Sequence, residues 1–225
     1  LFADILLVPM ALGRDVRFVA GEGPKLDPLS PEEIDTMTVG DVEGLLGPVG
    51  ETVSRLSKEL PGETTLIGFA GSPWTVATYM IEGGGSKDFA RAKALMYDAP
   101  DAMEALLAKL SAATSLYLQA QIEHGADAVM IFDTWGGALT PEAYVQFSLE
   151  PMAKIVAHLK RVAPTVPVVL FTKGGGQHLE LMTETGCDGL GLDWTTDIGQ
   201  ARTRVGAHVA LQGNLDPSIL YASPE

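Results

Sequence analysis

Cysteine is nearly absent from this sequence of 225 residues, which contains only Cys187. A single cysteine cannot form an internal disulfide, and it cannot by itself build a thiolate metal cluster. The four histidines, His124, His158, His178 and His208, do not have the spacing of metal ligands. The sequence therefore predicts no metal site.

Basic residues are also scarce, with 15 lysines and arginines against 29 acidic residues and a net charge of −14. Such a surface opposes binding to nucleic acid or to anionic lipid. It does not exclude an anionic small molecule, because a few cations or backbone donors inside a cleft can outweigh the average field.

Long apolar runs are missing as well, since none reaches the roughly 18 residues that a membrane-crossing helix needs. No charged and apolar leader opens the sequence. We therefore expect a soluble protein with a cytoplasmic location and no membrane partner.

The two ends of the sequence resemble interrupted elements. Residues 1–6 read as the exit from an apolar strand, and Ser223-Pro224-Glu225 combines the residues that start a helix. With 46% hydrophobic residues, the chain can bury one sizeable core. We expect residues 1–225 to form a single barrel domain that is truncated at both ends.

Short β-rich runs alternate with longer helical patterns along the chain. The predicted strands are residues 1–6, 66–71, 127–133, 166–172, 189–193 and 209–213. The predicted helices include residues 101–124, 141–163, 177–185 and 197–205. Serial strand–helix units imply parallel strands.

The residues that follow the strands favour a closed barrel over an open doubly wound sheet. No GxGxxG motif follows any strand, and most strands finish in polar or glycine-rich residues. The strand ends are Phe132-Asp133-Thr134-Trp135, Phe171-Thr172-Lys173-Gly174, Leu192-Asp193-Trp194 and Gln212-Gly213-Asn214-Leu215-Asp216. Polar contributions from several strand ends are typical of a barrel mouth. We therefore predict an α/β fold of the (β/α)8 TIM-barrel type, incomplete in this chain.

Three polar residues near strand ends are candidates for a binding site. Asp4 stands between apolar residues, where a carboxylate must find donors, although it also suits a helix cap or an ion pair. Tyr79 belongs to a helix that follows a strand and is equally compatible with ordinary packing. The Thr134 hydroxyl could contact a ligand or satisfy a turn. Local chemistry leaves both readings open for each residue.

Two glycine runs and one lysine offer rival hypotheses. Gly83-Gly84-Gly85-Ser86 and Gly174-Gly175-Gly176 could present backbone amides to an anion, but turns with positive φ explain them more simply. A desolvated Lys173 at a strand end could form a Schiff base with a carbonyl substrate, whereas a solvated lysine is the simpler interpretation.

Six segments in order resemble the uroporphyrinogen decarboxylase family in its bacterial form. They are Phe2-Ala3-Asp4-Ile5-Leu6, Gly21-Glu22-Gly23-Pro24, Pro73-Trp74-Thr75 with Tyr79, Phe132-Asp133-Thr134-Trp135-Gly136-Gly137, Phe171-Thr172-Lys173-Gly174-Gly175-Gly176 and Leu211-Gln212-Gly213-Asn214-Leu215-Asp216-Pro217. The resemblance covers essentially the whole chain, which corresponds to the central portion of the family's proteins.

This resemblance implies a carboxy-lyase of haem and chlorophyll precursor synthesis that works without a cofactor. It removes carboxyl groups from the acetate side chains of uroporphyrinogen, through partly decarboxylated intermediates, to give coproporphyrinogen. The resemblance assigns Asp4 to the inward-facing pyrrole N–H groups and Tyr79 and Thr134 to substrate binding. It also implies a homodimer. The family's substrate-gripping arginines and a further substrate-contacting histidine lie in segments that this sequence does not contain, so we expect the 225 residues alone to lack turnover.

Three alternatives remain open at this point. A zinc-dependent corrinoid methyltransferase would share the barrel but needs a sulfur and nitrogen ligand cluster. A lyase that uses a Schiff base would act through Lys173. A noncatalytic tetrapyrrole-binding protein would keep the cleft without chemistry.

Overall fold

The computed structural model describes residues 4–19 and 23–223. Its main sheet has five parallel strands whose order in the sheet follows their order in the chain. The strands are β3 (Ile67–Gly71), β4 (Ala128–Asp133), β5 (Val168–Thr172), β6 (Gly189–Gly191) and β7 (Ala210–Gln212). Gly71 pairs with Phe132, and Asp133 pairs with Thr172. The register therefore places the carboxyl ends of β3, β4 and β5 at one edge.

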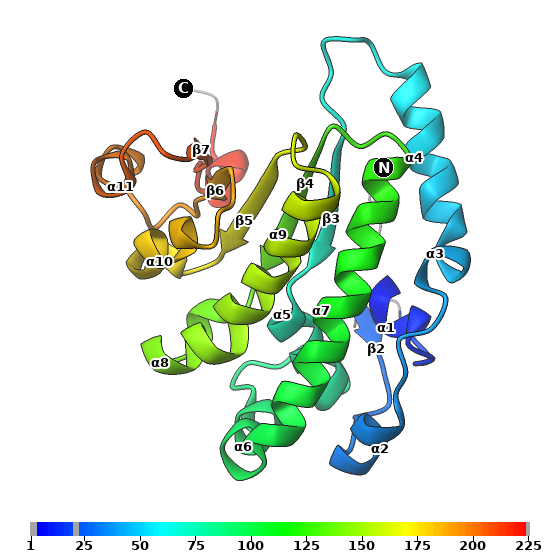
Figure 1. The fold of residues 1–225 in the computed structure, drawn as a ribbon. Coiled ribbons are helices and arrows are strands. Elements are labelled where there is room, and N and C mark those ends of the chain that lie inside the picture. The colour runs from blue at the N-terminus through cyan, green and yellow to red at the C-terminus, as the bar shows by residue number, and fades with distance from the viewer. Residues whose placement is uncertain (1–3, 20–22, 224–225) are drawn as a thin grey trace.

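Helices return the chain from each strand to the next. Between β3 and β4 lie α5 (Pro73–Glu82), α6 (Ala90–Asp98) and α7 (Pro100–Glu123). A continuous helical run joins β4 to β5, formed by α8 (Pro141–Tyr144), the π-helical segment η2 (Val145–Leu149) and α9 (Glu150–Val162). Figure 1 shows α7 and α9 side by side across one face of the sheet, where they pack on each other. This layering is that of an α/β barrel, of which the described strands form only a part.

Shorter elements complete the carboxyl-terminal half of the sheet. The 3₁₀ helix η3 (Gly175–His178) and α10 (Leu179–Glu184) connect β5 to β6, and α11 (Ile198–Val205) connects β6 to β7. Asp197 caps α11 by accepting a hydrogen bond from the Gln200 N–H. A last 3₁₀ helix, η4 (Pro217–Tyr221), follows β7.

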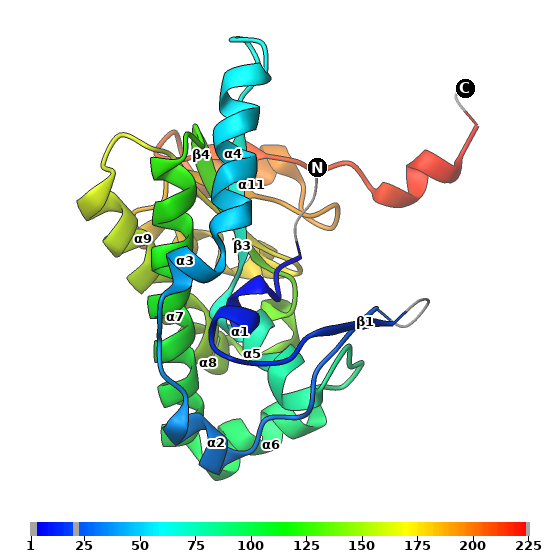
Figure 2. The same cartoon turned by 90° about the vertical axis from the view of Figure 1, so that its right-hand side faces the viewer.

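The amino-terminal segment forms a separate layer along α7. It contains α1 (Leu7–Ala11), a hairpin of β1 (Arg17–Val19) and β2 (Gly23–Lys25), α2 (Pro31–Thr36), α3 (Val42–Leu45) and α4 (Gly47–Glu59). Each of the four helices contacts α7, whereas the hairpin extends away from it (Figure 2). A reciprocal pair of hydrogen bonds between Ser30 and Glu33 starts α2.

The predicted alternation of strands and helices is confirmed in β3 to β7, with strand ends one to two residues shorter than expected. The four predicted helices are present near their expected positions. Of the proposed strand at residues 1–6, residues 1–3 lie outside the described residues, and Ile5 and Leu6 form a turn that leads into α1. Of the predicted helix start at Ser223-Pro224-Glu225, residues 224 and 225 lie outside the described residues.

Within residues 4–19 and 23–223, no helix combines the length and apolar character needed to cross a membrane.

Candidate active site

The floor of the candidate site is a row of three aromatic rings on neighbouring strands. Alternate residues of β3, β4 and β5 face opposite sides of the sheet, so Ala70, Ile131 and Leu170 are buried in the core. Phe69, Phe132 and Phe171 lie on the other side and are half-buried. Their ring centroids are 6.0 Å apart between Phe69 and Phe132 and 5.8 Å apart between Phe132 and Phe171. The rings are inclined to one another, at 86° and 59°, and give this side of the sheet an apolar character.

Asp4 lies at the carboxyl end of β3. A Cβ atom added to Gly71, the last residue of β3, would lie 3.0 Å from the Cβ atom of Ile5, which places the segment around Asp4 against this strand end. Asp4 is half-buried, and its Oδ1 accepts a hydrogen bond from the Leu6 N–H at 2.8 Å. A carboxylate offers about four acceptor positions, so the group retains capacity to bind further donors.

Tyr79 reaches the same region from α5, which starts directly after β3. Ser72 caps this helix by accepting a hydrogen bond from the Thr75 N–H, and Pro73 occupies its first position. Burial raises the pKa of the Tyr79 hydroxyl, a hydrogen bond with the Trp135 side chain opposes that rise, and the negative charge of Asp4 adds to it. The structure therefore brings Asp4 within electrostatic range of Tyr79.

Thr134 is the first residue after β4 and immediately precedes Trp135. Its side chain is half-buried, and its hydroxyl makes no hydrogen bond to any described residue. Trp135 stands close to Tyr79, with ring centroids 6.4 Å apart. Thr134 is thus placed at the same sheet edge as Tyr79, with its hydroxyl uncommitted among the described residues.

Asp133 is a functional candidate that the sequence reasoning missed. It is fully buried, and its carboxylate accepts four hydrogen bonds from the hydroxyls of Ser72, Thr75, Ser148 and Thr172. Burial raises the pKa of Asp133, while the hydroxyl hydrogen bonds oppose that rise. The sequence does contain a signal for this role. Asp133 directly follows the apolar run of β4, and the hydroxyl residues Ser72 and Thr172 stand at the ends of β3 and β5.

Lys173 and Trp194 form a polar and aromatic part of the rim after β5 and β6. The Lys173 Nζ atom lies 5.9 Å from the Trp135 ring centroid and 5.6 Å from that of Trp194. Asp193 lies nearby and accepts hydrogen bonds from Thr195 at 2.9 Å and 2.6 Å. Burial alone would raise the pKa of Asp193, but these bonds, the Gly174 N–H and the Lys173 charge together lower it.

The glycine runs have structural roles. Gly83 ends α5 with a φ of +80°, and Gly174 precedes η3 with a φ of +72°. Both conformations favour glycine, which supports the turn interpretation of these runs.

The part of the chain that the structure describes contains no cluster of three or more His, Cys, Asp or Glu residues suited to a metal ion. His124 hydrogen-bonds Ser54, and His158 hydrogen-bonds Gln119. His178 is instead buried and stacks on the ring of Tyr144, with centroids 4.1 Å apart.

Polar side chains at consecutive strand ends, above an aromatic floor, define an α/β barrel of the class that carries enzyme sites at the carboxyl ends of its strands. The family model described as uroporphyrinogen decarboxylase (URO-D) matches residues 1–225. The chain belongs to this family.

Two curated relatives have the same description. The uroporphyrinogen decarboxylase of Alkalilimnicola ehrlichii is 60% identical, with 100% of this chain and 63% of the relative covered. That of Hydrogenovibrio crunogenus is 58% identical, with 100% and 65% covered. The chain therefore spans slightly less than two thirds of the length of these relatives.

A solved structure described as a methyltransferase from Methanosarcina mazei matches 96% of this chain and 63% of its own chain, with a TM-score of 0.78 and 20% sequence identity. At 20% identity this likeness concerns only the fold, and it supports the assignment of an α/β barrel. The sequence similarity of the chain is to decarboxylases.

Proposed function

We propose that the natural protein containing this chain is a uroporphyrinogen decarboxylase, which removes the acetate carboxyl groups of uroporphyrinogen to give coproporphyrinogen without a cofactor. The identity to relatives of that description supports the substrate and the reaction. The observation that carries the proposal is the position of the segment around Asp4, which lies against the end of β3 where α5, the helix that carries Tyr79, begins.

The proposed role of Asp4 follows from the difficulty of the reaction. Direct loss of CO₂ from an acetate side chain would leave an unstable carbanion, whereas protonation of the adjacent pyrrole carbon first creates a cationic ring that accepts the electrons. An ionised Asp4 that accepts pyrrole N–H bonds would favour this cation over the neutral ground state, as transition-state stabilisation requires. Its single hydrogen bond to the Leu6 N–H leaves acceptor positions for that purpose.

Tyr79 and Thr134 are proposed to bind the side chains of the substrate. Burial raises the pKa of Tyr79 further above its ordinary value of 10.0, so its hydroxyl is protonated at neutral pH. A phenol hydroxyl carries one proton, which Tyr79 can donate to a substrate carboxylate. The Thr134 hydroxyl has no described partner and can donate in the same way.

The proposal includes a homodimer in the cytoplasm that binds uroporphyrinogen and its partly decarboxylated intermediates, with neither nucleic acid nor membrane as a partner. The excess of 29 acidic over 15 basic residues argues against both of those partners. It also makes each cation near the site important, because the substrate is itself highly anionic.

Anaerobic incubation of the natural protein with uroporphyrinogen, followed by separation of the porphyrin products, tests this proposal. Coproporphyrinogen and intermediates with fewer carboxyl groups are the expected products. Binding without any loss of CO₂ would identify a noncatalytic tetrapyrrole-binding protein instead. Tight stoichiometric zinc, together with methyl transfer, would favour a methyltransferase.

A further inference from the structure

A buried carboxylate joins the segments that surround the candidate site. Ser72 and Thr75 donate to the Oδ1 atom of Asp133 at 2.7 Å and 3.0 Å. Ser148 and Thr172 donate to its Oδ2 atom at 2.6 Å and 3.2 Å. The donors come from the start of α5, from η2 and from the end of β5. Asp133 therefore connects the exits of three strands through one group.

The four hydroxyl donors favour the ionised form of Asp133 and oppose the rise in its pKa that burial causes. This ionised form fixes the direction of the hydrogen bonds. Each hydroxyl has one proton, and each gives that proton to the carboxylate, so each can only accept from its other neighbours. Ser72 accepts from the Thr75 N–H at 3.1 Å, and Thr75 accepts from the Trp135 N–H at 3.2 Å. Thr172 likewise accepts from the Tyr144 hydroxyl at 3.0 Å. The nitrogen of a neutral amide in place of the carboxylate would donate a hydrogen bond. At least one of the four hydroxyls would then have to accept where it now donates.

Two of these hydroxyls hold parts of the candidate site directly. Ser72 caps α5, the helix that carries Tyr79. Thr75 holds the backbone N–H of Trp135, whose carbonyl oxygen also accepts from the Trp74 indole at 3.2 Å. Because Trp135 follows Thr134 and contacts Tyr79, its position affects both proposed substrate-binding side chains.

Substrate cannot reach this carboxylate. Asp133 has no exposed surface, and a Cβ atom added to Gly136 would lie only 1.8 Å from its Oδ2 atom. Asp133 can therefore act on the site only through the groups that surround it.

We propose that Asp133 is a positioning residue, whose ionised carboxylate orients the Ser72 and Thr75 hydroxyls and thereby fixes Trp135, Tyr79 and Thr134 for substrate binding. The kinetic part of this inference rests on the proposed function, and the structural part does not.

The test uses the natural protein with 5-fluorotryptophan in place of tryptophan, and the signal that Trp135→Phe removes assigns the ¹⁹F resonance of Trp135. Asp133→Asn preserves the shape and removes the charge. Thr75→Val removes the hydroxyl that links Asp133 to Trp135, and Thr75→Ser keeps it. Ser111→Ala is the matched control, because Ser111 is another buried hydroxyl whose hydrogen bonds go to the backbone of Leu107 and Pro151.

We expect Asp133→Asn and Thr75→Val to shift the Trp135 resonance and to lower kcat/KM by about 10- to 100-fold, since displacements of about 1 Å have effects of this size. Thr75→Ser should restore both values to near those of the unmodified protein. Ser111→Ala should lower the Tm but leave the resonance and kcat/KM unchanged.

An unshifted resonance with normal kcat/KM in Asp133→Asn would overturn the inference. If Asp133→Asn does not fold, the contrast between Thr75→Val and Thr75→Ser decides, and equal effects of the two would also overturn it. If the unmodified protein shows no decarboxylation, the proposed function fails, while the ¹⁹F resonance still tests the positioning role.

Discussion

The Nζ atom of Lys173 lies 5.9 Å from the centroid of the Trp135 indole ring. Trp194 approaches the same ammonium group from another strand exit, at 5.6 Å. The ion pairs found among the described residues do not include Lys173, whose side chain is exposed. The rings of Trp135 and Trp194 thus hold a cation at the carboxyl-terminal edge of the sheet. Trp135 directly follows Thr134 in the chain.

Replacing this cation should weaken the binding of a substrate with many carboxylates. We expect Lys173→Met to raise the KM for uroporphyrinogen about tenfold, equivalent to about 1.4 kcal/mol, with a smaller change in kcat. Lys173→Arg should retain most of the affinity, because it keeps the charge and the stacking on indole. Steady-state kinetics at low ionic strength measure both variants.

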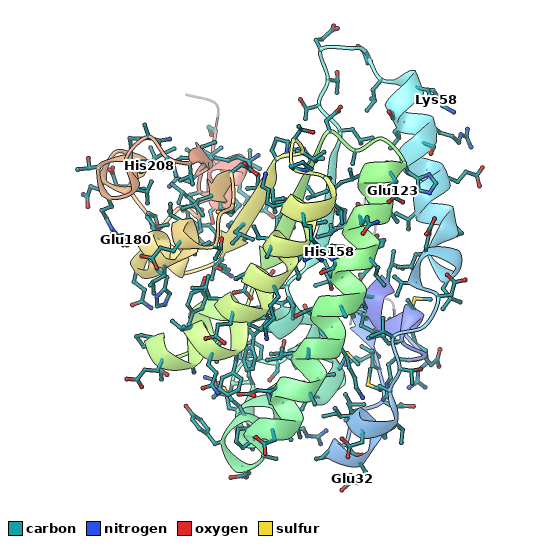
Figure 3. The ribbon with its side chains drawn as sticks, in the orientation of Figure 1. Glu32, Lys58, Glu123, His158, Glu180 and His208 are labelled. Atoms are coloured by element: carbon teal, nitrogen blue, oxygen red, sulfur yellow. The ribbon has the colours of Figure 1, made fainter. Side chains whose placement is uncertain are left out.

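Lys58→Met is the control, since Lys58 points outward from α4 (Figure 3). An equal rise of KM in both lysine variants would show a general charge effect and contradict the role of Lys173. Trapping of a carbonyl ligand on Lys173 by borohydride would instead revive the Schiff-base alternative.

The loops that follow β4 and β5 approach each other so closely that Gly137 has no space for a side chain. A Cβ atom there would lie 2.2 Å from the carbonyl oxygen of Lys173. Gly137→Ala should lower the free energy of unfolding by about 1–3 kcal/mol, because the two loop backbones must separate. Gly40→Ala should have little effect, since nothing lies within 4 Å of the added atom. Denaturant unfolding compares the two, and similar losses in both would refute the close approach.

The stacked pair of Tyr144 and His178 should make stability depend on pH. His178 is buried, its Nε2 atom has no hydrogen-bond partner among the described residues, and burial lowers its pKa below the ordinary value of 6.5. Between the lowered pKa and about 6.5, the unfolded chain binds more protons at this residue than the folded chain does. The contribution of neutral His178 to the free energy of unfolding is therefore complete above about pH 6.5. It is lost as the pH falls toward the pKa of His178 in the folded protein.

His178→Phe keeps an aromatic ring against Tyr144 and removes the titrating group. The fall in Tm between about pH 7.5 and pH 5 should be smaller in this variant than in the unmodified protein. His208→Gln, at an exposed position labelled in Figure 3, should leave that fall unchanged. A fall that is as large in His178→Phe as in the unmodified protein would rule out His178 as its source.

The strands and their order could be predicted because short apolar runs and polar strand ends are local features of the sequence. Phe132-Asp133-Thr134 illustrates this, since its apolar run ends where β4 ends. The amino-terminal helices escaped prediction, because α1 and α3 have only five and four residues and their packing on α7 is a tertiary property. The π-helical segment Val145–Leu149 was predicted only as ordinary helix for the same reason.

The candidate site was predictable only in part. Asp4, Tyr79 and Thr134 came from a family resemblance, and local chemistry alone left each of them ambiguous. The hydrogen bonds of Asp133 could not be foreseen, because Ser72 lies 61 residues before it and Thr172 lies 39 residues after it. Only the parallel register of β3, β4 and β5 brings these hydroxyls to one carboxylate.

The central claim is that the charge of Asp4 stabilises a cationic ring during decarboxylation. The most direct measurement is the rate of anaerobic uroporphyrinogen decarboxylation by the natural protein with Asp4→Asn. The amide oxygen can still accept from the Leu6 N–H, and Asp15→Asn, at an exposed carboxylate, serves as the control. We predict a fall in kcat of about 100-fold or more for Asp4→Asn and none for Asp15→Asn. Nearly normal decarboxylation by Asp4→Asn would contradict the account.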